Sequence, residues 1–341
     1  MKLIHLPIFA LLVRSILCQM ESQIYFYYDS ANEMSTMYPA CSVECECPSL
    51  FPTAMYCTHR NLQTIPIIPA QIKYLYLQNN RLTGIPNGAF DNSTNLRWII
   101  LDNNQIKNDK IGKKVFSKLK SLQRLYINNN NLTEVIHPLP KSLVELKLSS
   151  NMISKIGNSF KGLENLTTLV LEGNRLKDVG GSLAHLKSLM YLDLSKNRLT
   201  KLPDELPSTV EMFYIDYNNI EAIPMDYFKK TSILQYLRMA HNKITDEGIP
   251  DKVFNITSLI ELDLAFNKLK NIPLVNENLE NLYLQANKIE KFSLNSFCRI
   301  TSSEDFSRIK YLRLDGNNIT HASLPLEMPQ CLRVAAQVLI N

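Results

Sequence analysis

The residues with the widest chemical range in this chain of 341 residues are its seven cysteines, because a thiol can bind a metal, act as a nucleophile or form a disulfide. They are Cys18, Cys41, Cys45, Cys47, Cys57, Cys298 and Cys331. A zinc site is the alternative for the four that crowd together after residue 40. A single residue separates Cys45 from Cys47, however, whereas zinc-binding pairs usually have two to four residues between them. The spacing therefore favours disulfides over a metal site.

The histidines and glycines form no motif that predicts catalysis. None of the six histidines belongs to an HExxH motif, and the sequence contains no GxSxG, GxGxxG or GxxxxGK. The histidines are His5, His59, His137, His185, His241 and His321. We therefore expect a protein that is not an enzyme and that needs no cofactor or metal.

Composition and charge exclude further classes of protein. Apolar residues make up 45% of the chain and charged residues 20%, so the chain can bury a large core. The net charge of +5 is small and scattered, whereas nucleic-acid binding needs a concentrated basic face. After residue 18, no apolar run approaches the roughly 20 residues that span a membrane. Neither a nucleic-acid binder nor a membrane-spanning protein is expected.

The first 18 residues are typical of a secretory signal. Lys2 and His5 give a polar start, residues 6–13 are almost wholly apolar, and Cys18 precedes Gln19. A transmembrane anchor is the alternative, but this apolar stretch is too short to be one. Secretion would leave six cysteines in an oxidising compartment, where an even number indicates disulfides.

An internal repeat determines the predicted fold. The pattern LxxLxLxxNxL, with Ile, Val, Phe or Met accepted at the leucine positions, fits eleven segments whose starts lie 20 to 30 residues apart. They are Ile72–Leu82, Leu96–Ile106, Leu122–Leu132, Leu143–Ile153, Leu166–Leu176, Leu189–Leu199, Val210–Ile220, Leu234–Ile244, Leu259–Leu269, Leu279–Ile289 and Ile309–Ile319. All keep the asparagine: Asn80, Asn104, Asn130, Asn151, Asn174, Asn197, Asn218, Asn242, Asn267, Asn287 and Asn317. The sequence therefore predicts a leucine-rich repeat.

The predicted architecture is an α/β leucine-rich repeat solenoid. The LxL core of each repeat is a short strand with its leucines inward, and neighbouring strands pair in parallel into a curved sheet on the concave face. The asparagine can satisfy backbone groups that would otherwise be buried unpaired. Repeats this short leave little room for helices, so we expect short 3₁₀, polyproline or strand segments on the convex face. The terminal cysteines are expected to cap the open ends.

The residues on either side of the inward leucines should face the concave side. The aromatic ones are Tyr74, Tyr76, Trp98, Tyr126, Tyr191, Tyr214, Tyr236, Tyr283 and Tyr311. Charged residues interleave with them, and aromatic residues together with arginine are the composition of interface hot spots. The alternative is that strands simply favour tyrosine. Exposed rings in rows are unfavourable without a partner, so we interpret this face as a binding surface.

The cysteine run Cys41-x3-Cys45-x-Cys47-x9-Cys57, the repeats and the terminal pair resemble the small leucine-rich proteoglycans. The x9 spacing and a tyrosine-rich leader resemble the keratan-sulfate-bearing subgroup, and the resemblance covers essentially the whole chain after the signal. Further matches to the subgroup are Tyr74–Leu77, Val115–Lys120, Pro138–Leu143, Val275–Asn281 and Cys331–Ala335.

The resemblance implies a domain organisation and a disulfide pattern. It implies bonds between Cys41 and Cys47, between Cys45 and Cys57, and between Cys298 and Cys331. The long last spacing implies an "ear" that protrudes from the penultimate repeat. The expected domains are the signal peptide (1–18), a flexible tyrosine-rich extension (19–40), the N-terminal cysteine cap (41–70), the repeats (71–290), and the ear with the C-terminal cap (291–341).

Two kinds of modification are expected in a secreted chain. The five NxS/T sequons are Asn92, Asn131, Asn165, Asn255 and Asn318. The resemblance implies keratan sulfate or oligosaccharides at the first four; the alternative for Asn131 and Asn318 is that the repeat itself places asparagine before leucine or isoleucine. Tyrosine sulfation is expected at Tyr25, Tyr27 and Tyr28, with an unmodified polar tail as the alternative.

The resemblance also implies a partner and a function. The family's concave central repeats contact fibrillar collagen, and Asp216 matches the aspartate implicated there; Tyr214, Arg238 and Asp193 are neighbouring candidates. We expect a secreted extracellular-matrix core protein that regulates the diameter and spacing of collagen fibrils. Growth factors, basic matrix proteins and a second copy of the chain are further candidate partners. The alternative function is a soluble ligand-binding protein or co-receptor in innate immune or growth-factor signalling.

Overall fold

The structure is a computed structural model that describes residues 41–298, 306–320, 322 and 324–340. All of these residues lie in one compact unit, Ala40–Asn341. The predicted signal and tyrosine-rich extension fall outside the described residues, so their boundaries stay predictions.

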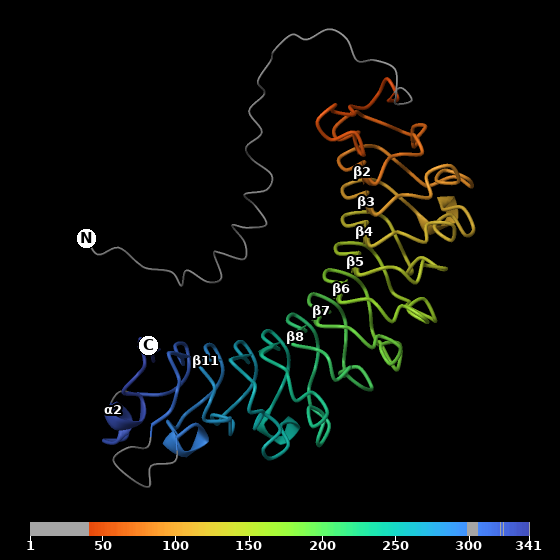
Figure 1. Cartoon of the computed structure of the whole chain (residues 1–341). Coiled ribbons are helices and arrows are strands. Elements are labelled where there is room, and N and C mark those ends of the chain that lie inside the picture. The colour runs from red at the N-terminus through yellow and green to blue at the C-terminus, as the bar shows by residue number, and fades with distance from the viewer. Residues whose placement is uncertain (1–40, 299–305, 321, 323, 341) are drawn as a thin grey trace. The chain divides into compact units, whose positions relative to one another are not determined.

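Short strands stack in chain order into one parallel sheet of thirteen strands, which lines the inner side of the repeats (Figure 1). The predicted leucine-rich repeat solenoid is therefore confirmed. Each strand pairs in unshifted register with the next, for example Leu192 with Phe213 and Phe213 with Leu237. The strands are β1 (Ala54–Tyr56), β2 (Tyr74–Tyr76), β3 (Trp98–Ile100), β4 (Arg124–Tyr126), β5 (Glu145–Lys147), β6 (Thr168–Val170), β7 (Tyr191–Asp193), β8 (Met212–Tyr214), β9 (Tyr236–Arg238), β10 (Glu261–Asp263), β11 (Asn281–Tyr283), β12 (Tyr311–Arg313) and β13 (Gln337–Leu339).

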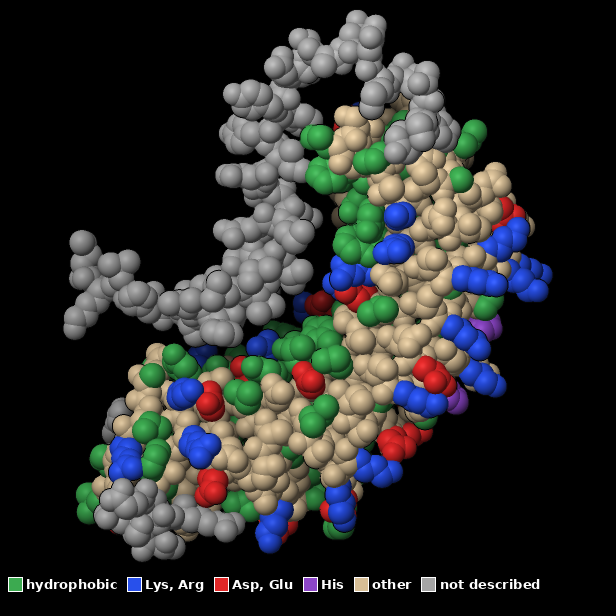
Figure 2. Space-filling model, viewed as in Figure 1, with side chains coloured by type: hydrophobic (Ala, Val, Ile, Leu, Met, Phe, Trp, Pro, Cys, Tyr) green, Lys and Arg blue, Asp and Glu red, His purple; other side chains and the backbone are tan. Residues whose placement is uncertain are grey.

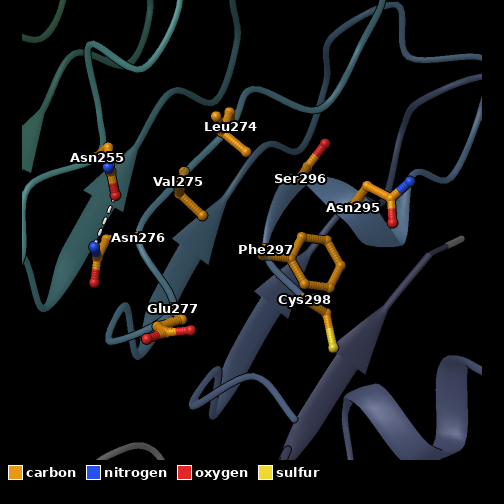
Figure 3. Close-up of a pocket in the computed structure, with 9 residues that line it drawn as sticks. All are labelled: Asn255, Leu274, Val275, Asn276, Glu277, Asn295, Ser296, Phe297 and Cys298. Carbon is orange, nitrogen blue, oxygen red and sulfur yellow. Dashed lines mark hydrogen bonds between the residues drawn. The ribbon is translucent and has the colours of Figure 1, made fainter. Parts of the chain in front are cut away.

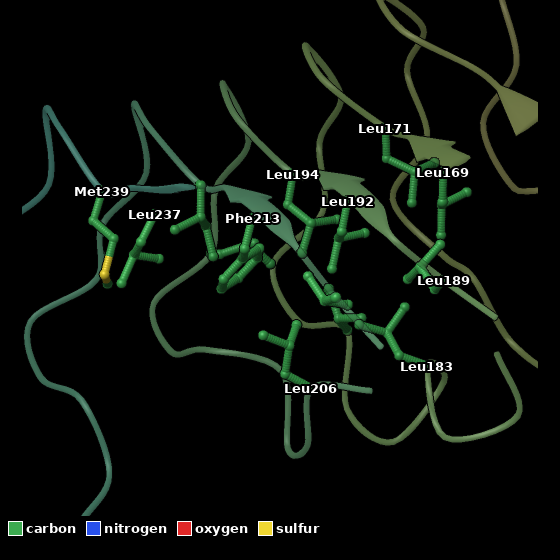
Figure 4. Packing of buried hydrophobic residues seen from close by; sticks show 14 of the residues in the cluster. Leu169, Leu171, Leu183, Leu189, Leu192, Leu194, Leu206, Phe213, Leu237 and Met239 are labelled. Carbon is green, nitrogen blue, oxygen red and sulfur yellow. The ribbon is translucent and has the colours of Figure 1, made fainter. Parts of the chain in front are cut away.

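The core is a continuous stack of apolar side chains, one set from each turn. The middle residue of every repeat strand is fully buried, and the leucine-type residue two positions later is buried beside it. Figure 4 shows this stack around Leu192, Phe213 and Leu237, with Leu183 and Leu206 closing it from the outer side. Full burial of a leucine side chain stabilises the fold by about 1.5–3 kcal/mol. No turn could bury these side chains alone, so the turns stabilise one another.

Ten of the eleven repeat asparagines are buried, and their amides link adjacent turns. The side chain of Asn197 is typical: its Nδ2 donates to the carbonyl oxygens of Leu171, 2.9 Å away, and Leu194, 3.0 Å away. Its Oδ1 accepts a hydrogen bond from the backbone N–H of Leu176 at 3.0 Å. The amide thereby pairs backbone groups that would otherwise be buried without partners.

The convex side consists of turns and short 3₁₀ segments, as the short repeats predict. The 3₁₀ segments are η1 (Asn108–Lys110), η2 (Asp246–Gly248) and η3 (Leu294–Ser296), and the one α-helix among the described residues is the four-residue α2 (Met328–Cys331). No helix in the described part of the chain has the length and apolar character needed to cross a membrane.

Disulfides close both ends of the repeat stack, as the cap prediction requires. The N-terminal cap contains the bonds Cys41–Cys47 and Cys45–Cys57, and Cys298 is bonded to Cys331 in the C-terminal cap. Each cap also contributes a strand to the sheet: β1 pairs with β2, and β13 pairs with β12. The sheet is therefore two strands longer than the eleven repeats predicted.

Replacement of Asn197 by alanine should lower the free energy of unfolding by about 2–4 kcal/mol, because it leaves several buried backbone groups unpaired. Urea denaturation followed by circular dichroism measures the difference. Asn158, which is exposed, provides the matched control, and Asn158→Ala should change the stability by less than about 0.5 kcal/mol. Equal losses for the two variants would contradict the bridging role.

Candidate functional site

The pleat of each strand turns its first and third residues toward the inner, concave side. The nine aromatic residues predicted for this side are all half-buried, and none is turned into the core. Figure 2 shows apolar side chains next to basic and acidic ones along the inner side of the repeats. The concave face therefore has the mixed aromatic and ionic character of a protein-binding surface.

Aromatic side chains pair across the first strands of the sheet. Tyr56 stacks on Tyr76, with ring centroids 4.8 Å apart, and Tyr74 meets Trp98 edge to face at 4.9 Å. The guanidinium of Arg124 lies over the Trp98 ring at 4.3 Å. These contacts hold the rings in fixed positions, so a partner would bind here with little loss of side-chain freedom.

An ionic cluster follows on β4 and β5. Arg124 forms an ion pair with Glu145 at 2.9 Å, and the Tyr126 hydroxyl donates a hydrogen bond to the same carboxylate. Lys147 lies over the Tyr126 ring at 4.6 Å. Burial, together with the bond to Glu145, raises the pKa of Tyr126, so its hydroxyl stays protonated and remains a donor.

The four residues predicted to contact collagen lie close together on β7 to β9 and the turn after β8. Three consecutive strands place Asp193, Tyr214 and Arg238 opposite one another in the sheet register. Asp263 of β10 is the next residue in this row, opposite Arg238. Asp216 lies two residues beyond Tyr214, and its Oδ1 accepts a hydrogen bond from the backbone N–H of Ala240 at 2.7 Å. The structure thus brings the sequence candidates into one patch.

Arg238 is held in the centre of this patch. Its Nε donates to Glu261 at 2.7 Å, and its guanidinium lies 4.8 Å from the centroid of the Tyr214 ring. Tyr214 also meets Tyr191 edge to face at 5.4 Å. Glu261 is almost fully buried, and leaving it unpaired would be strongly unfavourable, so Arg238 is committed to this ion pair.

Three aspartates of the patch lack such a partner. Asp193, Asp216 and Asp263 form no ion pair with any residue that the structure describes, although each accepts a backbone hydrogen bond. Burial, reinforced by the neighbouring Asp263, raises the pKa of Asp216 to about 7, and burial raises the pKa of Asp263 to about 6. Burial raises the pKa of Asp193 as well. Burial therefore disfavours the charged form of all three side chains.

A row of rings beside this patch was not predicted from the sequence. Tyr217, His241 and Phe266 occupy the position just before the repeat asparagine in three successive turns. Their rings stack with centroids 4.0 Å apart, and Tyr217 and Phe266 are about half exposed. Burial between the two neighbouring rings lowers the pKa of His241. The signal was available, since aromatic residues at one repeat position in consecutive turns must be neighbours.

The predicted glycosylation sites lie in accessible places. Asn92, Asn165 and Asn318 are exposed and Asn131 is half-buried. Asn255 is exposed too, and its Oδ1 accepts a hydrogen bond from Asn276 at 2.8 Å. It borders a cavity of about 220 Å³ that extends toward Phe297 and Cys298 (Figure 3). This bond leaves Nδ2 of Asn255, the atom to which a glycan would be joined, without a partner among the described residues.

The three tyrosines predicted to carry sulfate, Tyr25, Tyr27 and Tyr28, lie outside the described residues. No group of three or more His, Cys, Asp or Glu side chains in the described ranges is arranged to hold a metal ion.

Two family models match the chain. The leucine rich repeat model matches residues 70–132, 140–176, 164–207 and 208–269, and the leucine rich repeat N-terminal domain model matches residues 40–69. Together these matches cover more than half of the sequence.

Whole-chain relatives are similar over nearly the full length. The chain is 53% identical to lumican of Coturnix japonica over 99% of both chains. It is 52% identical to fibromodulin of Gallus gallus, over 87% of this chain and 79% of that protein. A chain of a solved octameric complex of Latrophilin 3, Unc5D and FLRT2 (LRR) superimposes with a TM-score of 0.67 and 26% identity, covering 87% of this chain and 83% of that one.

The raised pKa of Asp216 predicts that the Asp216→Asn variant is more stable than the parent at pH 8. An unfolded aspartate titrates near 3.9, so between about pH 4 and pH 7 the folded protein binds more protons, and stability falls as the pH rises. Asparagine removes the charge and keeps an oxygen for the N–H of Ala240. The gain should be about 1–2 kcal/mol at pH 8 after solvent screening, and close to zero at pH 4.

Asp315 is the matched control with the opposite sign. Its pKa is lowered by hydrogen bonds from Arg313, at 3.0 and 2.7 Å, so its contribution is present at neutral pH and is lost in acid. Asp315→Asn should therefore destabilise the protein slightly at pH 8. Thermal unfolding measured from pH 4 to pH 8 tests both variants, and a less stable Asp216→Asn protein at pH 8 would contradict the assignment.

Proposed function

Since the chain belongs to the small leucine-rich proteoglycan family and is close to lumican, we propose that it is a secreted extracellular-matrix core protein that binds fibrillar collagen through its concave face. In this proposal the bound protein limits the lateral growth of fibrils. Keratan sulfate or oligosaccharides at the sequons keep neighbouring fibrils apart.

The observation that carries the proposal is the set of unpaired carboxylates of Asp193, Asp216 and Asp263. Burial raises the pKa of all three side chains, so keeping them charged lowers stability, and such arrangements are frequent at functional sites. A basic side chain of a partner would supply the missing counter-charge. The free energy gained when this ion pair forms is then larger than that of an exposed ion pair.

The length of the inner sheet leaves room for an extended partner. Thirteen strands about 4.8 Å apart give an inner sheet roughly 55–60 Å long, with aromatic side chains along much of it. A collagen triple helix has glycine at its axis and presents its other side chains outward, so basic residues and proline rings would both be accessible. The rings of Tyr191 and Tyr214 can pack against proline, and the carboxylates can pair with lysine or arginine.

The exposed sequons support the second part of the proposal. Asn92, Asn165 and Asn255 lie in loops outside the sheet strands, so glycans there would leave the concave face free. Hydrated, anionic sugars on the outside of a bound core would repel those on the next fibril. Core and sugar thus have separable tasks.

Asp216→Asn should weaken collagen binding at least about fivefold, because a counter-charge for a partner's basic group is lost. Solid-phase binding of enzymatically deglycosylated protein to fibrillar collagen measures the core's contribution. The matched control is Glu164→Gln, which removes an exposed carboxylate paired with Lys187 and should leave binding unchanged.

The same proteins should differ in fibril assembly. Fibrils formed with the parent should be thinner in electron micrographs than fibrils formed alone, and Asp216→Asn should restore much of the diameter. If deglycosylated parent failed to bind collagen, the core would not be the binding element. If Asp216→Asn bound as well as the parent, Asp216 would have no part in the contact.

A further inference from the structure

The row of exposed rings beside the concave patch has a regular geometry. We call Tyr217, His241 and Phe266 the aromatic ladder. Tyr217 and His241 are inclined by 11°, and His241 and Phe266 by 10°, with 4.0 Å between centroids in both cases. The rings are therefore nearly parallel and in face-to-face contact, and only the two end rings have a face without a ring neighbour within the ladder.

The backbone that displays these rings is unusual for their residue type. Tyr217, His241 and Phe266 have φ angles of 53°, 53° and 55°, in the left-handed region that favours asparagine and glycine. Asparagine does occupy the equivalent position in other turns, as Asn79, Asn103 and Asn129. Bulky residues held there are unfavourable by about 1–3 kcal/mol each, and such positions are frequent at binding sites.

The two ends of the ladder differ. Beyond Tyr217 the next turn back carries Lys196, whose ammonium forms an ion pair with Glu172 at 2.7 Å. Beyond Phe266 the equivalent positions are Ala286 and Gly316, which are small. Backbone hydrogen bonds of 2.9 Å join each of these turns to the next, from Phe266 N–H to Gln285 and from Ala286 N–H to Asp315.

The ladder therefore stops at an open place, which we call the slot and define by Phe266, Ala286 and Gly316. Ala286 is half-buried and Gly316 is exposed, and no ring continues the stack above them. A Cβ at Gly316 would lie only 3.4 Å from the Ala286 nitrogen, so these two turns are in close contact and form the floor. A flat group resting on the exposed Phe266 ring would be the next rung.

The polar groups around the slot favour a flat group that donates hydrogen bonds. Gln285 adjoins Ala286 in sequence, and its Oε1 is buried with no hydrogen-bond partner in the described structure. Asp315 adjoins Gly316, but both of its carboxylate oxygens accept hydrogen bonds from Arg313. Asp263, three residues before Phe266 on β10, forms no ion pair with a described residue. An aromatic face beside an unpartnered acceptor and an unpaired carboxylate is complementary to a planar cation.

We propose that the slot takes the guanidinium of an arginine side chain that projects from the collagen triple helix. This inference rests on the proposed function and adds the residue type that is recognised. Guanidinium is planar, stacks on aromatic rings and donates hydrogen bonds in its own plane. The ammonium of lysine is a compact point charge that cannot stack in this way. The slot therefore selects arginine over lysine.

The test uses two triple-helical peptides of Gly-Pro-Pro repeats that differ in one guest residue, arginine or lysine, and the full-length deglycosylated protein. The parent should bind the arginine peptide about threefold to fivefold more tightly than the lysine peptide, the range expected for one exposed stacked cation. Surface plasmon resonance or calorimetry at fixed salt measures the ratio.

Two variants remove the slot without straining the backbone. Phe266→Asn takes away the ring, and Ala286→Asn fills the floor; asparagine suits the positive φ of both positions, 55° and 54°. Both should abolish the preference for arginine while leaving the melting temperature equal to that of the parent or higher. Lys196→Asn, with φ 54° at the other end of the ladder, is the matched control and should keep the preference.

The outcomes separate the two proposals. Equal binding of the two peptides to the parent, or an unchanged preference in Phe266→Asn, would overturn the slot and leave collagen binding intact. If neither peptide nor fibrillar collagen bound, the proposed function would fail and the slot assignment with it.

Discussion

The bridge that each buried asparagine makes between turns is the interaction on which the other features of the solenoid depend. Its amide saturates backbone groups at the point where the chain leaves the strand, and it joins two successive turns. Asn197 bonds to Leu194 of its own turn and to Leu171 and Leu176 of the turn before. A buried amide with all its bonds made is strongly position-specific, because any shift would leave several groups unpaired. The strands are therefore stacked without register shifts, and leucines from each turn meet leucines from the next.

This constraint on the backbone leaves the concave side chains free to vary. Because packing and asparagine bonds fix the fold, the concave surface can carry groups that reduce stability, such as the unpaired carboxylates of Asp216 and Asp263. The turns after β8, β9 and β10 also contain strained positions, at which Tyr217, His241 and Phe266 are displayed. Unfavourable electrostatics and unfavourable backbone angles thus gather on one part of a scaffold whose stability lies elsewhere.

The sequence was sufficient for features that recur in every turn. Leucine spacing and the repeat asparagine predicted the solenoid. Strand alternation predicted which rings, such as Trp98 and Tyr214, lie on the concave face. Features that depend on one particular neighbour were not predictable in this way. Strands β1 and β13 lack the repeat pattern, and the raised pKa of Asp216 depends on its burial and on Asp263, a residue two strands away.

The unshifted stacking of strands also gives the inner sheet a regular spacing along its length. Two strand intervals span about 9.6 Å, while three residues in a polyproline-type helix rise about 9.3 Å. The two repeat lengths are nearly equal. A triple helix lying along the sheet would therefore present the same residue of its three-residue repeat to every second strand. Small errors in matching would accumulate over the full length, and the curvature of the array sets how many triplets stay in phase.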